Sequence, residues 1–501
     1  MTDLVGEDTF RVLPPKPYES LAEYVAAGGG KGLSAAKAVE PQTIIDELAA
    51  SGLRGRGGAG FPTGEKWRTI KSFASPVLRT SVVVNAAEGE PGTFKDRTII
   101  RWNPYAVIEG ALIAARAMDA GSVTIATKES FTDEVVHVRA AIAEVEAADW
   151  LGDVEIGIVE GPSEYLYGEE TALLEVIDGR PPFPRIAPPY RRGIVEVVQS
   201  EGDADSGSGL PADVQMAGTE DDSAAPPVLV NNVETMANVP AIIANGAKWF
   251  RTIGTAKSPG TIVCTITGDV THPGVVEIPM GTPLRVAIDT GAGGVLRGSN
   301  VGTVLVGVSS AVLTADLLDT ELSYEAMSAI GSGLGSAGFI VMADNTNPVG
   351  VAAGASRFLA VESCGQCTPC KQDGLEIARL LAAAAAGEAT PDDLTAIKDR
   401  LTTVADGARC SLAAQQQAVV GSLLNNFAEQ VAARFEPGAT PVDEQLVAAL
   451  LDINDKGAVV DTMFANKQPD WTYDDVDSGK TPVERFTDHR SEETFEEASQ
   501  T

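Results

Sequence analysis

Residues 362–370 read ESCGQCTPC and place three cysteines, Cys364, Cys367 and Cys370, at intervals of three in one short loop. The whole chain of 501 residues contains only five cysteines. A C-x-x-C-x-x-C spacing lets three thiolates from one loop converge on three corners of a cubane iron–sulfur cluster. The fold around this loop must therefore bring a fourth ligand to it from elsewhere.

Cys410 is the expected fourth ligand. In bacterial ferredoxins a further cysteine follows within three or four residues and precedes proline, whereas residue 374 is glycine here. Cys410 lies in DGARCSL and follows a predicted helix, 390–406. This helix opens with Thr390 as its N-cap and Pro391 at its first helical position. A helical hairpin can therefore carry Cys410 back to the loop.

Two other interpretations of the cysteines are weaker. Structural zinc sites usually combine two C-x-x-C pairs or mix cysteine with histidine, and none of His137, His272 and His489 lies near the loop in the sequence. Inert packing is weaker still, because a loop with glycine and proline has no apolar face to fill. Cys264, in the strand-like TIVCTIT, is best explained as a small buried hydrophobic residue. One four-iron cluster thus uses four of the five cysteines.

A second motif, GLRGRGGAGFPTGEKW at 52–67, contains Gly55, Gly57 and Gly60 as a G-x-G-x-x-G match. The Rossmann fingerprint requires a strand before these glycines, but the preceding segment, 43–50, has the apolar spacing of a helix. We therefore reject the standard dinucleotide fold. We expect a shaped pocket in which backbone N–H groups approach a planar or phosphorylated ligand, rather than a flexible surface turn.

Helical and strand patterns alternate in the first part of the chain. The patterns predict strands at 81–84, 122–126 and 154–159 and helices at 108–118 and 134–147. This alternation indicates an α/β domain with its function at the strand ends.

Later segments differ in character. The acid-rich stretch 199–225 is predicted to be a disordered surface insertion. Short β-like runs between 259 and 342, with one helical pattern near 284–290, suggest a small α+β module. Helices are expected from there on, including 375–386, 411–434 and a last one at 441–453. The tail from Asp470 is acid-rich, and we expect it to be loosely held or to wrap a partner.

The charge of the chain excludes some partners. Its 37 Lys and Arg residues against 70 Asp and Glu residues give a formal net charge of −33, which repels nucleic acid and anionic membranes. The N-terminus lacks the regions of a signal peptide, and no run approaches the roughly 18 apolar residues that span a bilayer. We expect a cytoplasmic protein without membrane insertion, whose reducing surroundings keep the cysteines available as ligands.

Five motifs together resemble one protein family. The sequence contains, in this order, GLRGRGGAGFPTGEKW, NAAEGEPGTFKDR, YLYGEETAL, VNNVET and ESCGQCTPC. This order is similar to that of the flavoprotein subunit that oxidises NADH in respiratory complex I, and of its relatives in NAD-dependent formate dehydrogenases and NAD-reducing hydrogenases. The resemblance covers about residues 20–435. It implies FMN and a 4Fe–4S cluster as cofactors and NAD(H) as substrate.

The resemblance also implies a division of the chain. Residues 1–250 would form a non-classical Rossmann-like α/β domain for FMN and NADH, interrupted by the acidic insertion. Residues 251–350 would form a ubiquitin-like α+β domain of the SLBB type, and residues 351–436 a four-helix bundle carrying the iron–sulfur cluster. Residues 437–501 would be a C-terminal extension with an acidic tail.

Matching positions suggest the binding residues. On the FMN side the resemblance implies Gly55, Gly57, Lys66, Asn85, Glu88, Tyr165, Gly168, Glu169, Asn231, Asn232 and Thr235. On the NADH side it implies Gly57, Gly58, Ala59, Phe61, Glu90 and Glu170, and Gly60 and Tyr190 complete the cofactor-binding set. Glu90 and Glu170 would lie nearest to the chemistry. No general acid or base is required, because the protein has to hold two rings in contact and exclude water.

Some positions depart from the complex I form. Ala87 stands where an acidic residue is usual, Ala187 and Tyr190 replace the outer residues of KPPF, and Thr69 replaces a phenylalanine near the expected adenine site. Tyr190 can still stack on a ring, but the loss of a cation at position 187 weakens the expectation of dinucleotide binding.

The resemblance implies a diaphorase subunit of a larger enzyme. Such a subunit exchanges hydride between NAD(H) and FMN and single electrons with the cluster. The departures favour a soluble NAD-dependent formate dehydrogenase, with complex I and NAD-reducing hydrogenase as alternatives. Expected partners are a thioredoxin-like 2Fe–2S subunit or domain and a catalytic chain with molybdenum or tungsten. A non-catalytic electron-transfer scaffold is the alternative from a different class.

Overall fold

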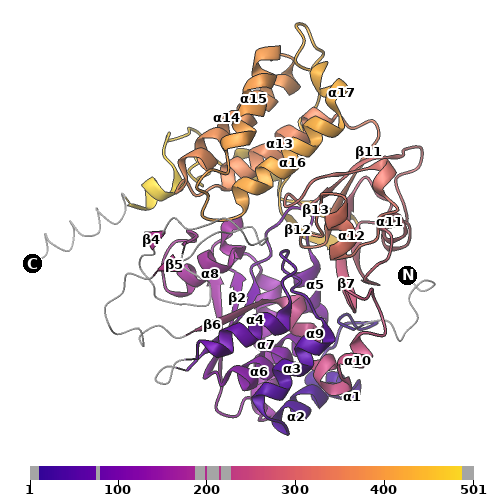
Figure 1. Ribbon diagram of the computed structural model, residues 1–501, viewed down its shortest axis with the longest axis vertical. Helices are drawn as coiled ribbons and strands as arrows, with labels where there is room; N and C mark the ends of the chain where they lie inside the picture. The colour runs from indigo at the N-terminus through magenta and orange to yellow at the C-terminus, as the bar shows by residue number, and fades with distance from the viewer. Residues whose placement is uncertain (1–10, 75–78, 187–197, 200–213, 216–226, 488–501) are drawn as a thin grey trace, which may run out of the picture.

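The computed structural model describes residues 11–74, 79–186, 198–199, 214–215 and 227–487. An α/β part, a second sheet and a group of C-terminal helices follow one another along the chain (Figure 1). Most of the predicted insertion, together with Ala187 and Tyr190, lies outside the described residues. Within the described ranges, no helix has both the length and the apolar character needed to cross a bilayer.

A four-stranded parallel sheet forms the centre of the α/β part. Its order is β3-β2-β1-β6, made of Glu155–Gly161, Ser122–Lys128, Ser81–Ala86 and Val228–Asn232. The three strands predicted from sequence are confirmed. From β1 the chain moves outward through β2 and β3 and returns to pair β6 on the other side of β1. This reversal creates a crevice at the carboxyl ends of β1 and β6, where parallel sheets bind ligands.

Side chains of β1 alternate between two cores, as the period of a strand requires. Val82 and Val84 face the helices α6 (Pro104–Met118) and α9 (Val233–Asn245), whereas Val83 packs with Tyr167 and with α8 (Glu170–Ile177). Helices α6 and α9 approach closely, because a Cβ on Gly110 would lie 2.0 Å from the carbonyl oxygen of Met236.

The remaining helices of the α/β part are short or moderate in length. They are α1 (Leu21–Ala26), α2 (Lys31–Lys37), α3 (Pro41–Ser51), α4 (Thr63–Ser72), α5 (Lys95–Trp102), α7 (Thr132–Ala147), η1 (Tyr165–Gly168) and α10 (Ala247–Phe250). The glycine-rich loop connects α3 to α4, so a helix precedes it, as predicted. The predicted helices at 108–118 and 134–147 correspond to α6 and α7.

A five-stranded sheet forms the second part. Its order is β10-β9-β11-β7-β8, made of Leu313–Thr314, Val301–Val306, Gly338–Ala343, Thr261–Gly268 and Gly274–Pro279. The central pair, β11 and β7, is parallel, and the other pairs are antiparallel. Helix α11 (Leu284–Gly291) covers this sheet with Leu284 and Ile288, and α12 (Tyr324–Ala329) follows later.

The C-terminal helices are α13 (Pro348–Glu362), α14 (Thr368–Ala386), α15 (Pro391–Thr403), α16 (Leu412–Asn426) and α17 (Ala428–Ala432). Helices α13, α14 and α16 share one core, to which Ile397 of α15 contributes. The N-cap expected at Thr390 is confirmed, and it forms a reciprocal capping box with Asp393. Figure 1 shows these helices stacked at one end of the molecule.

The helix predicted at 441–453 is wrong. Residues 441–449 belong to no helix or strand, and after them β12 (Leu450–Asn454) pairs with β13 (Gly457–Val460). Tertiary contacts occupy the backbone groups that a helix would need. The Arg97 guanidinium donates to the carbonyl oxygen of Leu450 at 2.7 Å and to that of Leu451, and the Gln445 N–H donates to Gly350 at 3.1 Å. Apolar spacing alone could not reveal these partners.

The tail after Asp470 is also not loosely held, as far as the structure describes it. Asp470 and Trp471 are buried, and Phe486 packs edge-on against Phe183 with ring centroids 5.6 Å apart. The tail therefore wraps its own chain up to Thr487.

We predict opposite effects for two glycine substitutions within helices. In α13, Gly354→Ala would put a Cβ 1.7 Å from the backbone oxygen of Gln445 and should destabilise the protein by about 1–3 kcal/mol. In α16, Gly421→Ala meets nothing within 4 Å and should stabilise by about 0.5–1 kcal/mol. Thermal unfolding midpoints measure both. A Gly354→Ala variant that unfolds at the wild-type temperature would contradict the tight contact between α13 and the C-terminal extension.

Candidate functional site

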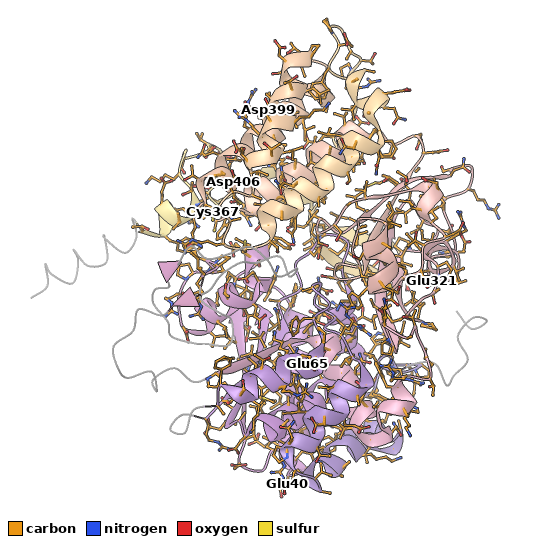
Figure 2. All side chains as sticks on the ribbon, viewed as in Figure 1. Glu40, Glu65, Glu321, Cys367, Asp399 and Asp406 are labelled. Carbon is orange, nitrogen blue, oxygen red and sulfur yellow. The ribbon has the colours of Figure 1, made fainter. Side chains whose placement is uncertain are left out.

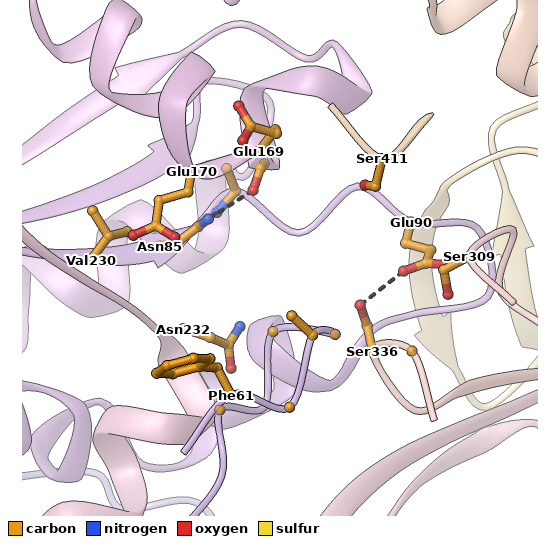
Figure 3. A pocket seen from close by; sticks show the side chains of 18 of the residues that line it. Phe61, Asn85, Glu90, Glu169, Glu170, Val230, Asn232, Ser309, Ser336 and Ser411 are labelled. Atoms are coloured by element: carbon orange, nitrogen blue, oxygen red, sulfur yellow. Dashed lines mark hydrogen bonds between the residues drawn. The ribbon is translucent and has the colours of Figure 1, made fainter. Parts of the chain in front are cut away.

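One cavity of about 950 Å³ opens at the carboxyl ends of β1 and β6 (Figure 3). Every predicted cofactor-binding residue that the structure describes lines it: Gly55, Gly57, Gly58, Ala59, Gly60, Phe61, Lys66, Asn85, Glu88, Glu90, Tyr165, Gly168, Glu169, Glu170, Asn231, Asn232 and Thr235. Tyr190 lies outside the described residues. Two positions at which the sequence departs from the complex I form, Thr69 and Ala87, line the cavity as well.

Asparagines at the two strand ends hold the surrounding loops. The Asn85 amide donates to the carbonyl oxygen of Gly168 at 2.8 Å, which ties β1 to the turn before α8. The Asn231 side-chain oxygen accepts from the Trp67 indole at 2.8 Å, which ties β6 to α4. Thr235 accepts from the Arg56 N–H at 2.9 Å. The crevice is therefore framed by side chains that are already hydrogen-bonded.

The glycine-rich loop rests on the second sheet. The Tyr324 hydroxyl donates to the carbonyl oxygen of Gly55 at 2.8 Å, and the Arg56 guanidinium donates to that of Thr261 at 2.9 Å. Gly60 has a φ of +63°, and a Cβ there would lie 2.3 Å from the Tyr324 ring. Glycine at this position is therefore required by packing against α12. Space at Gly57 is also limited, because a Cβ there would lie 3.2 Å from the Cβ of Asn232.

Two glutamates of the cavity cap helices. Glu88 accepts from the N–H groups of Asp96 and Arg97 at 3.2 and 3.3 Å, at the start of α5. Glu169 accepts from those of Thr171 and Ala172 at 2.9 and 2.8 Å, at the start of α8. Burial raises the pKa of both carboxyls, and with the nearby charge of Asp96 the pKa of Glu88 reaches about 7.

Glu90 joins the α/β part to the second sheet. One of its oxygens accepts from the Val308 N–H at 3.1 Å, and the other accepts from the Ser336 hydroxyl at 2.8 Å (Figure 3). Burial raises its pKa, and these hydrogen bonds oppose that rise. Gly307 makes the approach possible, because a Cβ there would lie 2.3 Å from the Glu90 carboxylate.

Glu170, the other residue predicted nearest to the chemistry, is more accessible. Its carboxylate pairs with the Lys66 ammonium at 2.7 Å, and both side chains keep more than a fifth of their surface exposed. Lys66 belongs to the set that the resemblance implies on the FMN side. In this structure the same ammonium also orients Glu170 at the cavity wall.

A buried ion network lies beneath the cavity, and the sequence reasoning did not single it out. The Lys95 ammonium lies 2.7 Å from Asp96, 3.0 Å from Glu234 and 3.3 Å from the side-chain oxygen of Asn232. Burial alone would lower the pKa of Lys95, but the charges of Asp96, Glu234 and Glu88 outweigh it, and the pKa lies well above its ordinary value. Lys95 and Glu234 belong to the quoted motifs, so a search for paired charges within them could have found this network.

Other lining residues lie outside the five motifs that carry the family resemblance. They come from the loop after β9, the turn before β11 and the start of α16: Ser309, Ser310, Gly335, Ser336, Ser411, Leu412, Ala414, Gln415 and Ala418. Most of these residues are small or polar, and nothing in the neighbouring sequence marks them as part of a site. Only the packing of the three parts brings them to the site.

A second, smaller cavity lies among the cysteines. Cys364, Cys367, Cys370 and Cys410 all line it, since α14 and α15 form a hairpin that returns the chain to the loop. Figure 2 shows Cys367 where the C-terminal helices meet the α/β part. Cys264 lies elsewhere, buried in β7.

The four cysteines lie close to one another around the smaller cavity. No group of three or more His, Cys, Asp or Glu side chains in the described part of the chain is arranged for a single metal ion. Burial raises the pKa of the Cys370 thiol to about 11, and iron coordination would favour the thiolate.

The two cavities share a wall. Leu166, Cys410 and Leu412 line both of them. A group bound in the larger cavity can therefore lie next to a group held by the cysteines, separated by these side chains.

Comparisons with known proteins find similarity to two parts of the chain. A model of the Nuo51 FMN-binding domain matches residues 48–241, and a model of the NADH-ubiquinone oxidoreductase-F iron–sulfur binding region matches residues 350–434. An F subunit of NADH-quinone oxidoreductase from Rhizobium meliloti (strain 1021) is 35% identical over 433 residues, which are 84% of this chain and 96% of that protein. The corresponding F subunit from Mycobacterium tuberculosis (strain ATCC 25618 / H37Rv) is 34% identical over 426 residues, with shares of 83% and 89%.

A solved structure is similar in fold as well. The NAD⁺-reducing [NiFe]-hydrogenase in its H₂-reduced state aligns with a TM-score of 0.70 and 30% identity, covering 84% of this chain and 67% of that chain. In the air-oxidized state the TM-score is 0.69, and the shares are 85% and 68%.

We predict that Glu88 makes stability depend on pH. Its pKa of about 7 in the folded protein exceeds the ordinary 4.5, so the folded state binds this proton more tightly than the unfolded state does. The resulting stabilisation is present below about pH 4.5 and is lost as the pH rises through about 7. In flavin-free protein, the unfolding temperature of Glu88→Gln should therefore rise relative to that of wild type as the pH increases from about 4.5 to about 7. Glu388→Gln, on an exposed residue, is the control. A constant difference between Glu88→Gln and wild type would refute the shift.

Proposed function

The chain belongs to the family of NADH-quinone oxidoreductase F subunits, and from this premise we propose that its larger cavity binds FMN and NAD(H) and that its four cysteines hold the 4Fe–4S cluster. It is an NADH dehydrogenase module of an oxidoreductase, with FMN and a 4Fe–4S cluster as cofactors. FMN, when bound, converts two-electron hydride chemistry into one-electron chemistry.

The wall shared by the two cavities carries this proposal. Cys410 belongs to both cavities, so a cluster ligand would also border the flavin site. Electrons would have to cross only this wall. The hydrogen-bonded frame around Asn85 and Asn231 would hold FMN without rearrangement, which lowers the cost of binding.

We assign the dinucleotide to the mouth of the larger cavity. Phe61 lies there with 55% of its surface exposed, which is unusual for a large apolar side chain and fits stacking against a ring. Glu170, paired with Lys66, and the buried Glu90 are the side chains that we propose to orient the dinucleotide beside FMN. Neither has to transfer a proton.

We also assign the second sheet to a ubiquitin-like domain of the SLBB type. The parallel central pair β7 and β11, flanked by antiparallel β8 and β9, supports this assignment. Helix α11, which lies between β8 and β9 along the chain, supports it as well. Helices α13, α14, α15 and α16 would then form the bundle that carries the cluster.

Which complex the chain serves is a finer proposal. We propose an NAD-dependent formate dehydrogenase in the cytoplasm. The reason is that Ala87 and Thr69, which stand where the complex I form usually has an acidic residue and a phenylalanine, both line the larger cavity. The similar proteins are F subunits of NADH-quinone oxidoreductase and a hydrogenase, and they support complex I or an NAD-reducing hydrogenase as alternatives. A non-catalytic scaffold would keep the cluster and lose NADH oxidation.

We predict that Cys410→Ser separates flavin reduction from cluster reduction. A serine hydroxyl is a poor iron ligand compared with a thiolate, so the cluster should be lost or labile. NADH should still bleach the flavin absorbance, since the FMN-holding residues of the α/β part are unchanged. Anaerobic NADH titration with EPR detection measures both effects. Cys264→Ser, buried in β7, is the matched control and should keep the reduced-cluster signal.

An intact four-iron signal in Cys410→Ser would refute this ligand assignment. A wild-type protein that holds FMN and the cluster but is not reduced by NADH would instead support the scaffold.

We further predict that affinity purification of the full chain from its native cell will recover an iron–sulfur partner and a molybdenum- or tungsten-containing chain. Metal analysis and mass spectrometry of the purified complex test this. Recovery of a nickel–iron chain or of membrane subunits would overturn the formate assignment and identify the corresponding alternative.

A further inference from the structure

Lys371 directly follows the cysteine loop and is a buried cation. Its side chain is 1% exposed, and no carboxylate among the described residues lies within ion-pair distance of it. The three N–H groups of the ammonium are instead shared among four backbone carbonyl oxygens: those of Ala360 at 3.0 Å, Val361 at 3.2 Å, Ser363 at 2.8 Å and Pro469 at 2.6 Å. Burying a charge without a counter-charge is costly. The position therefore calls for an anion close to the loop.

The surroundings do not supply enough negative charge. Glu362, buried at the end of α13, is the main carboxylate acting on Lys371, but it pairs with the Lys467 ammonium at 2.7 Å. Lys128 is buried as well, and Glu362 is also the main carboxylate acting on it. Glu164 acts on Lys128 and Lys467 as a second carboxylate, so three buried ammonium groups share two carboxylates. A 4Fe–4S core with four thiolates carries about two negative charges when oxidised, which would balance the excess.

A segment outside the matched iron–sulfur region holds this arrangement together. We call residues 461–487 the C-terminal strap. From the strap, Pro469 supplies one of the four carbonyls, the Trp471 indole donates to Val361 at 2.9 Å, and the Val483 N–H donates to the carbonyl oxygen of Cys364 at 3.1 Å. Trp471 is 4% exposed. The strap therefore packs against both the cysteine loop and the end of α13.

We propose that Lys371 is the counter-charge of the cluster, that the C-terminal strap holds it at the cysteine loop, and that this cation raises the reduction potential of the cluster. The inference rests on the cluster ligands proposed above. Reduction makes the cluster more negative, so a fixed cation nearby stabilises the reduced state more than the oxidised state. Lys371 is a positioning residue, because it acts through the cluster and need not touch the substrate.

The test is an anaerobic redox titration of the full chain, with the reduced-cluster EPR signal as the readout. Lys371→Met keeps the length of the side chain and removes its charge. Its cluster should have a midpoint potential more negative by at least about 59 mV, which is a tenfold loss of electron affinity for one electron. Lys371→Arg keeps the charge and should stay close to wild type. Lys398→Met removes an exposed lysine from α15 and should have the wild-type potential.

A wild-type potential in Lys371→Met with an intact cluster would overturn the proposal. If Lys371→Met assembles no cluster, Lys371→Gln is titrated instead, since its amide can still donate to the carbonyls without charge. A negative shift in that variant supports the proposal, and an unchanged potential overturns it. If wild type itself lacks the four-iron signal, the ligand assignment fails rather than the role of Lys371.

The strap has its own test. Trp471→Ala should speed the loss of the cluster to an iron chelator several-fold, because the loop becomes open to solvent, while the flavin content stays constant. Tyr473→Ala changes a side chain of the same strap that is 51% exposed, and it should lose iron at the wild-type rate. Equal rates in Trp471→Ala and wild type would show that the strap does not protect the loop.

Discussion

The site depends on one buried carboxylate, Glu234, at the start of α9. Its oxygens lie 3.0 Å from the Lys95 ammonium and 3.6 Å from the Arg56 guanidinium, and one of them accepts from the Val263 N–H of β7 at 2.9 Å. Lys95 begins α5, and Arg56 belongs to the glycine-rich loop. A single side chain thus joins the loop, the end of β6 and the second sheet. Removing one partner from such a desolvated network leaves the others uncompensated, which makes the arrangement cooperative.

This network explains why the cavity has walls from three parts of the chain. The glycine-rich loop cannot bury an apolar core of its own, so it takes its shape from contacts with Tyr324 of α12 and Thr261 of β7. Glu90 adds a second link between the two parts, because its carboxylate accepts hydrogen bonds from Val308 and Ser336. The second sheet is therefore a structural support for the larger cavity as well as a connector to the C-terminal helices.

The C-terminal extension connects the same parts from the outside. Arg97 and Arg101 of α5 bond to β12, with Arg101 lying 2.9 Å from Asp452, while the strap reaches the cysteine loop. The surroundings of the cysteines are thus composed of residues that lie far apart along the chain. These contacts bring Glu362, Lys371 and Lys467 into one buried region, although each of these residues taken alone resembles an ordinary surface residue in the sequence.

The sequence by itself determined the local elements and the chemistry. Period-two and helical apolar patterns predicted β1, β2, β3, α6 and α7, the capping residues predicted the start of α15, and motif order predicted part of the lining of the larger cavity. These signals are local because neighbours along the chain create them. Only the tertiary structure decided that 441–453 is not a helix, that Gly60 accommodates Tyr324, and that Pro469 reaches Lys371. Such contacts depend on how distant segments pack, and packing leaves no periodic mark in the sequence of either partner.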